Sequence, residues 1–280
     1  MALPALAALA AAAERVTIGA PRWGRELYGA LDAEIVDRAA VPRDADVAIL
    51  FAPSFRTAWQ AKRVPRRIGL ATDARWWLLS DAVQPLSKHR RDDYAALASR
   101  VGVSVASTPR FEAPTTSAGT PHVGLNPVSA SGLTVDWPHF GALASRLVGQ
   151  GIPVIAYAGL GDSERVRAAV PPSTGVVYAP EYDLPALAAA LGHCRLFVSN
   201  DSGLGHFAAA CQTPVLSLFG STSAAQTGPA GAIALEAEGP ECRPCYRKRC
   251  PYAKPEVPCL AELEVGAVTR AVLAHWEETK

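Results

Sequence analysis

The residues with the clearest chemical potential lie between two apolar runs in the second half of the chain. Residues 196–199 are typical of a strand, an Asn-Asp-Ser-Gly turn follows, residues 204–211 are expected to form a small-residue helix, and residues 214–219 form the next apolar run. Two parallel strands joined by one helix place the turns that follow them at the same edge of a sheet. Open α/β sheets bind their ligands at that edge.

The turn before this helix and the turn after the second strand both offer ligands for an anion. Ser202 is expected to cap the helix, and the amides that follow it point outward, where the helix dipole adds about half a positive charge. Glycine at 203 and 205 keeps side chains away from a bound phosphate, and a histidine in the first turn adds a ring nitrogen. Two hydroxyl residues follow the second strand. The candidate anion ligands are Asp201, Ser202, Gly203, Leu204, His206, Ser221 and Thr222.

The rest of the chain alternates helices and strands, which predicts an α/β fold with doubly wound parallel sheets. In the first half, the expected elements are helix 2–13, strand 15–19, helix 23–31, strands 34–36 and 47–51, and helix 89–102. In the second half they are strand 122–126, helix 138–149, strand 153–158, and helices 163–170 and 183–191. The predicted domains are an N-terminal domain over 1–108, a linker over 109–121, a second domain over 122–262 and a C-terminal helix over 263–280.

Composition limits the classes of protein that fit. The net charge of +1 argues against bulk nucleic-acid binding. The sequence has no apolar run of about 18 residues, so no transmembrane helix is predicted. The Ala-rich opening has no basic start, so a buried helix is favoured over a signal peptide, and the protein is expected in the cytoplasm.

Four of the six cysteines are concentrated within one Pro-rich and basic loop, residues 242–259. In a reducing compartment they favour a structural zinc site over disulfides, although the spacing matches no standard zinc pattern. Reduced or paired structural thiols and an iron–sulfur cluster are the alternatives. The candidate metal ligands are Cys242, Cys245, Cys250 and Cys259.

Two strings carry a family resemblance, VSNDSGLGHFAAA at 198–210 and PVLSLFGSTSAAQTGP at 214–229. They resemble the donor-binding half of glycosyltransferase family 9, the heptosyltransferases of the lipopolysaccharide inner core, in particular the heptosyltransferase II type. The Cys-rich tail resembles the same type. The resemblance implies the GT-B architecture, two Rossmann-like domains facing a cleft. It also implies that the Asp-Ser-Gly turn holds the diphosphate of a nucleotide sugar such as ADP-heptose.

Other positions of the second half are placed near the donor. The turn after strand 122–126 brings Asn126 and Ser129 to the same crevice, and by resemblance Glu181 and Tyr182 lie near the base and ribose. The family commonly has a cation before the Trp-Pro pair where this chain has Asp136. A carboxylate at ~4 Å from a phosphate would be repelled by about 4 kcal/mol at an effective dielectric constant of 20, so Asp136 predicts a departure from the family pattern.

The first half carries an excess of cations. Nine Lys or Arg residues stand between positions 56 and 91, against four acids at 73, 81, 92 and 93. This excess predicts attraction of an anionic saccharide or glycolipid acceptor, with peripheral contact at the inner face of a membrane, and its alternative is a solvated basic face. The segment 51–81 resembles the acceptor side of the family. Arg56 and Arg75 are the candidate acceptor contacts.

The N-terminus departs from the family. MALPALAAL resembles a helix that in the family follows a strand and a Gly-Asp turn, whose Asp is the general base. That Asp has no counterpart here, so we expect either a start assigned too late or a truncated protein with impaired catalysis. The catalytic base cannot be named, and His206 is better placed to steady the leaving group.

The resemblance implies inverting glycosyl transfer without any required cofactor, the leaving-group charge being held by amides and hydroxyls. The main alternative is a noncatalytic or truncated nucleotide-sugar-binding GT-B protein. A sugar-nucleotide epimerase shares the GT-B fold, but its carboxylate and histidine constellation is not visible. A Rossmann dehydrogenase is disfavoured because no G-x-G-x-x-G follows an early strand.

Overall fold

A computed structural model of the chain describes residues 1–42, 44–86, 89–105, 111, 119–130, 134–253 and 256–278. The chain forms two compact units, residues 1–109 and 110–280, and each unit contains only parallel strand pairs within its described residues. This confirms the predicted α/β class. Most of the linker predicted over 109–121 lies outside the described residues, and the predicted domain boundaries stay a prediction.

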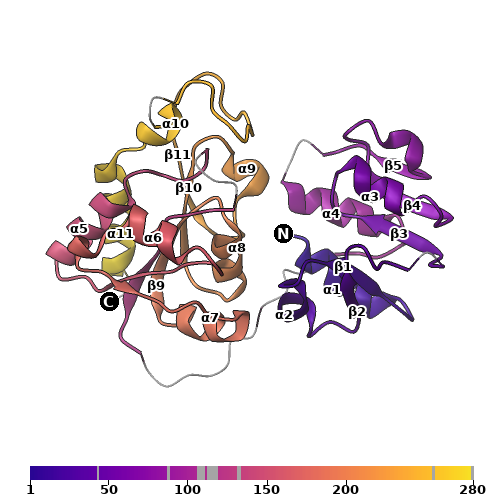
Figure 1. Cartoon of the computed structure of the whole chain (residues 1–280), viewed down its shortest axis with the longest axis horizontal. Coiled ribbons are helices and arrows are strands. Elements are labelled where there is room, and N and C mark those ends of the chain that lie inside the picture. The colour runs from indigo at the N-terminus through magenta and orange to yellow at the C-terminus, as the bar shows by residue number, and fades with distance from the viewer. Residues whose placement is uncertain are drawn as a thin grey trace. The chain divides into compact units, whose positions relative to one another are not determined.

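The first unit holds two small sheets, one of order β1-β2 and one of order β3-β4-β5 (Figure 1). Its strands are β1 (Thr17–Ala20), β2 (Glu34–Asp37), β3 (Val47–Leu50), β4 (Arg66–Leu70) and β5 (Asp81–Val83). Its helices are α1 (Leu3–Ala12), α2 (Gly24–Tyr28), α3 (Phe55–Gln60), the 3₁₀ turn η1 (Trp76–Leu78) and α4 (Arg90–Ser99). The opening helix is formed as expected, and α1 packs against α4.

The second unit is built on one six-stranded sheet of order β11-β10-β9-β6-β7-β8. Its strands are β6 (His122–Asn126), β7 (Val154–Ala156), β8 (Val177–Tyr178), β9 (Cys194–Asn200), β10 (Val215–Phe219) and β11 (Ile233–Glu236). Its helices are α5 (Phe140–Gly149), α6 (Ser163–Ala169), η2 (Pro172–Thr174), α7 (Leu184–Leu191), α8 (Gly203–Ala210), α9 (Ala224–Thr227), α10 (Pro258–Ala261) and α11 (Val265–Glu278).

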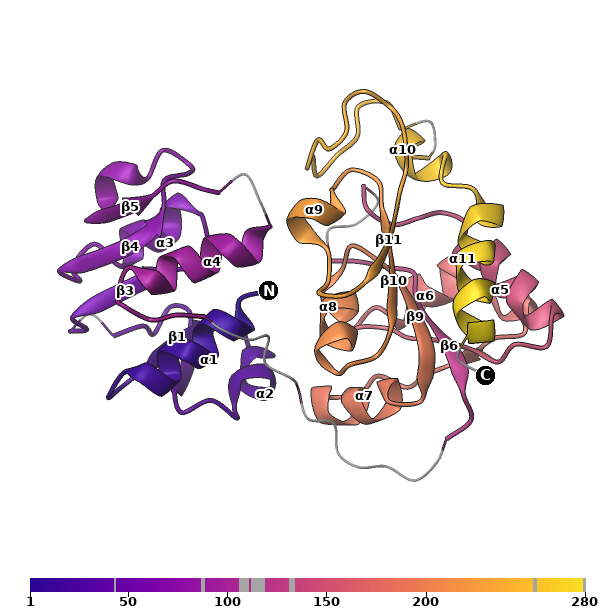
Figure 2. The ribbon, with the colours of Figure 1, turned by 180° about the vertical axis from the view of Figure 1, so that it is seen from behind.

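The central strands of this sheet are covered on both faces. Every residue of β6 and β10 is buried, as expected for a parallel sheet between two helix layers. Figures 1 and 2 show α5 and α11 on one face and α8 on the other, and α8 contacts both β9 and β10. The chain therefore winds outward from β6 in one direction and from β9 in the other.

The apolar positions of the C-terminal segment form a helix, as expected, and α11 packs against α5 and β9 of the second unit. Val268 and Val272 are fully buried in the core of that unit. No helix in the described part of the chain combines the length and the apolar character needed to cross a membrane.

Candidate functional site

The strand order locates the site before any side chain is considered. β6 and β9 are neighbours in the sheet, and the chain leaves them in opposite directions, so their carboxyl ends form a topological switch point. Asn126 ends β6 and Asn200 ends β9, and both side chains are buried there. Asn200 accepts a hydrogen bond from the Trp137 amide at 2.9 Å and donates to the Pro127 carbonyl at 2.8 Å, which fixes the turn after β6.

Ser202 caps α8 at this switch point. Its hydroxyl accepts a hydrogen bond from the Gly205 amide at 3.3 Å and donates to the Asn126 carboxamide oxygen at 2.9 Å. The structure therefore brings together two residues that the sequence placed 76 positions apart. The Gly203 and Leu204 amides precede the first intrahelical hydrogen bond, and amides in that position carry the positive end of the helix dipole.

The two glycines of this turn have different roles. A Cβ at Gly203 would meet no atom within 4 Å, so the side-chain position of this residue faces open space. A Cβ at Gly205 would lie 2.4 Å from the Ser199 hydroxyl oxygen, because α8 packs closely on β9 there. The expectation that both glycines admit a phosphate is corrected for Gly205, whose lack of a side chain serves packing. His206 follows, half-buried, and Leu204 is half-buried beside it.

The two hydroxyls predicted on the turn after β10 differ in their hydrogen-bond partners. The Thr222 hydroxyl oxygen is buried and has no hydrogen-bond partner within the described residues, which leaves it for a ligand. The Ser221 hydroxyl instead donates to the Thr134 carbonyl at 2.7 Å. It is therefore held by the protein and is not an open donor, contrary to expectation. Asp201 accepts a hydrogen bond from Thr227 at 2.8 Å, which ties the end of β9 to this turn.

Asp136, for which repulsion of a phosphate was predicted, is paired with groups of the protein itself. One carboxylate oxygen accepts a hydrogen bond from the Ser129 amide at 2.8 Å, and the other pairs with Arg165 at 3.1 Å. Burial raises the pKa of Asp136, while Ser129 and Arg165 oppose that shift. Arg165 also donates to the Ser129 carbonyl and pairs with Asp162. The Asp136 carboxylate thus orders the turn after β6, and Arg165 supplies the cation that the sequence lacked beside it.

The predicted base and ribose contacts lie beside the same helix as Arg165. Glu181 accepts a hydrogen bond from the Ser163 hydroxyl at 2.7 Å, and this hydroxyl lowers the pKa of Glu181. Tyr182 is half-buried. Asn126, another predicted donor contact, donates a hydrogen bond from its carboxamide to the Tyr157 carbonyl at 3.3 Å. Contacts of Glu181 and Tyr182 with a nucleotide stay a prediction.

The Cys-rich loop folds over the turn after β10. Arg243 donates to the Gly220, Phe219 and Thr222 carbonyls, and the amides of Cys245 and Tyr246 donate to the Ser221 carbonyl. These contacts brace the turn that carries the Thr222 hydroxyl. Arg243 is therefore a positioning residue. The sequence did not single it out, although it lies between Cys242 and Cys245.

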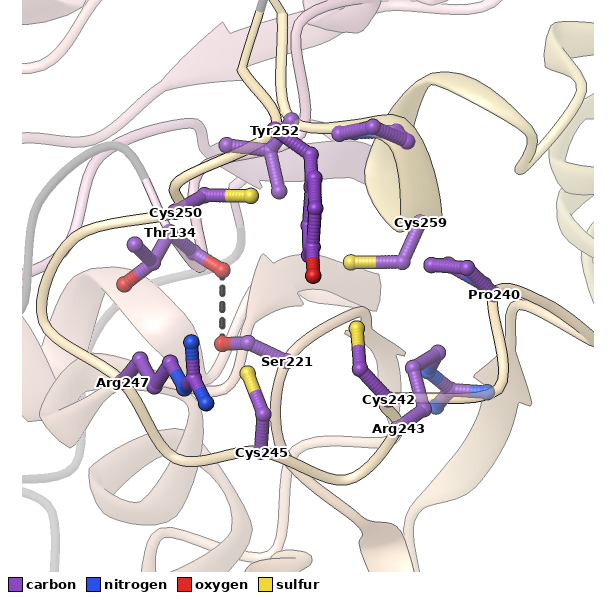
Figure 3. Close-up of a pocket in the computed structure, with 12 residues that line it drawn as sticks. Thr134, Ser221, Pro240, Cys242, Arg243, Cys245, Arg247, Cys250, Tyr252 and Cys259 are labelled. Atoms are coloured by element: carbon purple, nitrogen blue, oxygen red, sulfur yellow. Dashed lines mark hydrogen bonds between the residues drawn. The ribbon is translucent and has the colours of Figure 1, made fainter.

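The four loop cysteines line one cavity of about 20 Å³, into which the Tyr252 ring points (Figure 3). All six cysteines are free thiols, and burial raises the pKa of the Cys259 thiol. Within the described residues, which include every cysteine, no three His, Cys, Asp or Glu side chains could hold a metal ion. The predicted zinc site is therefore not supported by this arrangement, and the iron–sulfur alternative stays untested.

The two predicted acceptor contacts, both in the first unit, differ in burial. Arg75 is fully buried, and its guanidinium donates to the Leu70 carbonyl at 3.1 Å and to the Ala52 carbonyl at 2.7 Å. It also reaches the Thr57 hydroxyl at 3.1 Å. The prediction that Arg75 contacts an acceptor is therefore wrong, because its donors hold the loop before α3. Arg56 is exposed on α3, and its acceptor role stays a prediction.

A cavity of about 320 Å³ lies in this unit at the carboxyl ends of β3 and β4. Its charged lining residues are Asp73, Arg90 and Asp93. Asp73 has a φ of 53°, a left-handed conformation that is uncommon outside glycine and often marks a functional loop. In the sequence, Arg90 contributes only to the basic excess, and no motif marks Asp73 as a site residue.

The fold and site together define the chain as a two-unit α/β protein with a Ser-capped helix N-terminus at the switch point of its second unit. The family model described as glycosyltransferase family 9 (heptosyltransferase) matches residues 38–255. The chain therefore belongs to this family.

Individual relatives agree with that assignment. The chain is 33% identical over 129 residues to lipopolysaccharide heptosyltransferase 1 of Pseudomonas aeruginosa, covering 44% of this chain and 36% of that protein. It is 29% identical over 201 residues to lipopolysaccharide heptosyltransferase 2 of Salmonella typhimurium, covering 62% and 56%. The matches thus span from about a third to little more than half of these relatives.

Among solved structures, E. coli ADP-heptose lipopolysaccharide heptosyltransferase II matches with a TM-score of 0.73 at 21% identity, covering 100% of this chain and 96% of that one. At this identity the likeness shows the fold, which is GT-B.

Proposed function

We propose that the chain transfers a heptose-like sugar, with inversion, from a nucleoside diphosphate donor to a saccharide acceptor such as the lipopolysaccharide inner core. ADP-heptose is the donor we favour, since the E. coli structure of the same fold is described as an ADP-heptose transferase. The proposal rests on one observation, the α8 N-terminus at the switch point between β6 and β9.

The geometry there suits a diphosphate. The Gly203 and Leu204 amides stand in the first turn of α8, a Cβ at Gly203 would meet open space, and the dipole of an eight-residue helix favours negative charge at that end. The unpartnered Thr222 hydroxyl offers one more donor. Charge that develops on the departing diphosphate is stabilised by such fixed donors, because they need no reorganisation during the reaction. These donors belong to the chain itself, so no cofactor is part of the proposal.

The acceptor side of the proposal lies in the first unit. Arg56 is exposed on α3, and Arg90 lines the 320 Å³ cavity at the sheet edge. A guanidinium pairs well with the carboxylate or phosphate of an anionic saccharide. We therefore assign the anionic acceptor to this edge of the first unit.

Transfer is tested by incubating the protein with ADP-heptose and a heptose-deficient core glycolipid, with the product mass followed by mass spectrometry. We expect a product heavier by one heptose residue, and its loss in Gly203→Ala. ADP binding without transfer would favour the noncatalytic nucleotide-sugar-binding protein. Absence of both binding and transfer would overturn the proposal.

A further inference from the structure

Three aromatic side chains form an exposed patch on the first unit, called here the aromatic patch: Phe55, Trp59 and Trp77. They are 39%, 47% and 55% exposed, respectively, and Trp76, which precedes Trp77 in η1, is 64% exposed. The Phe55 ring stacks on Trp59 with centroids 6.2 Å apart and lies 6.0 Å from Trp77. Large apolar side chains on a protein surface are usually scattered singly, so a contiguous aromatic group indicates an interaction surface.

The patch stands on a fixed base and takes no part in the core. Beneath it, Ala58, Leu78 and Leu79 are buried together and join α3 to η1. The buried Arg75 guanidinium holds the segment before α3 through the Ala52 and Ser54 carbonyls. The aromatic rings are therefore presented outward by a rigid support.

Cations surround the patch. Lys62 lies with its Nζ atom 3.8 Å from the centroid of the Trp59 ring, and Arg56 and Arg63 are exposed on and beside α3. Between positions 52 and 78 the only acid is Asp73, whose carboxylate accepts a hydrogen bond from the Phe55 amide at 2.8 Å. A surface with exposed tryptophans and a net positive charge matches the interface of an anionic bilayer, where indole rings sit at the headgroup level and cations attract anionic lipid.

We propose that the aromatic patch docks the first unit on the surface of a bilayer that contains anionic lipid. The Asp73 carboxylate that caps α3 also lines the 320 Å³ cavity, so docking would bring the cavity rim close to the headgroups. That consequence rests on the proposed function, since it would deliver a lipid-linked acceptor to the cavity. The docking itself needs neither donor nor acceptor.

The test is co-sedimentation of the full chain with vesicles of phosphatidylcholine alone or with about 30% phosphatidylglycerol, with no donor or acceptor present. We expect binding to the anionic vesicles and a blue shift of tryptophan fluorescence. The variant Trp59→Ala/Trp77→Ala should bind at least about tenfold more weakly. Trp23→Ala is the matched control, because Trp23 is 50% exposed on the segment before α2, which Figures 1 and 2 place at the opposite end of the first unit from α3.

A second pair of variants tests the electrostatic contribution to vesicle binding. Lys62→Gln/Arg63→Gln should weaken binding to anionic vesicles by about 25-fold, about fivefold for each cation removed. Arg22→Gln/Arg25→Gln, exposed cations around Trp23, should leave binding unchanged. Circular dichroism verifies that each variant is folded.

Three results would overturn the proposal. They are equal vesicle binding by the Trp59/Trp77 variant and the wild type, no binding by the folded wild type, and a wild-type dimer in solution that this variant dissociates. The last result would assign the patch to a second copy of the chain. Because ADP titration in solution does not involve the patch, failure of docking and failure of the proposed transferase activity are distinguishable.

Discussion

Gly203 and Gly205 provide a matched pair of single-residue tests in one helical turn. A methyl group at Gly203 meets open space, so Gly203→Ala should keep the wild-type free energy of unfolding. It should weaken ADP binding by at least about tenfold, since one lost hydrogen bond to a charged acceptor costs about 1.5 kcal/mol or more. Calorimetric titration with ADP and urea unfolding measure the two effects. An unchanged affinity would show that the diphosphate does not approach this amide.

Gly205→Ala should have the opposite profile. Its Cβ would lie 2.4 Å from the Ser199 hydroxyl oxygen, so either this buried hydroxyl must rotate or α8 must shift away from β9. We expect the free energy of unfolding to fall by about 1–3 kcal/mol. Urea unfolding measures the loss, with Gly203→Ala as the control. Wild-type stability in Gly205→Ala would contradict the close packing of α8 on the sheet.

At the residue scale the sequence predicted the helix cap at Ser202 well and its surroundings less well. The Asp-Ser-Gly signal is local, so Ser202 as the cap could be inferred directly. The partner of Asp136 could not be inferred, because Arg165 is 29 positions further along the chain and only the folded sheet brings them together. Burial of Arg75 could not be predicted either, because the sequence of a basic segment does not show whether the donors of an arginine face solvent or backbone carbonyls.

At the scale of elements, α6 and the turn after β6 are coupled through one ion pair. Burial raises the pKa of Asp136 above its ordinary value of 3.8. The folded state then binds the proton more tightly than the unfolded state, so stability falls as pH rises through the interval between the two pKa values. Arg165 limits this loss because it opposes the shift.

Removing that cation should make the loss larger. Arg165→Gln should raise the pKa of Asp136 further, so its deficit in unfolding free energy relative to wild type should grow between about pH 4 and about pH 7. Urea unfolding across this range measures the deficit, and Asp136→Asn/Arg165→Gln should abolish its pH dependence. A deficit that is the same at every pH would show that the ion pair has no such role.

The two arginines of the first unit give a test of how α3 is held. Arg75→Gln should destabilise the first unit by about 3 kcal/mol, because backbone carbonyls that it satisfies lose charged donors in a buried place. Arg56→Gln should change stability by less than about 0.5 kcal/mol, since the side chain is exposed. Urea unfolding followed by tryptophan fluorescence compares them. Equal stability of the two variants would contradict the structural role of Arg75.

Element prediction succeeded where burial makes a strong pattern. The strand at 122–126 was predicted with the bounds of β6, since the β/α alternation restarts there after the Pro-rich linker, and all five of its residues are buried. β11 was missed because it is a four-residue edge strand whose residues are mostly exposed. The C-terminal helix was predicted from its apolar spacing, but spacing alone does not identify the surface against which a helix packs.

At the scale of the molecule, the proposed donor site contains no metal. Amides at α8 and the Thr222 hydroxyl would meet the charge of a diphosphate there, and a chelator cannot remove them. ADP affinity and heptosyl transfer should therefore be unchanged after treatment with EDTA. Both are measured before and after chelation, with added magnesium as the comparison. Loss of binding that magnesium restores would contradict this distribution of charge.

The most direct measurement is a nuclear magnetic resonance titration of the isotope-labelled protein with ADP, observing the backbone amides. If the α8 N-terminus binds the diphosphate, the Gly203 and Leu204 amide signals shift on saturation with ADP and do not shift with adenosine, which lacks the phosphates. ADP binding that leaves both signals in place, with the shifts confined to another part of the chain, would contradict it.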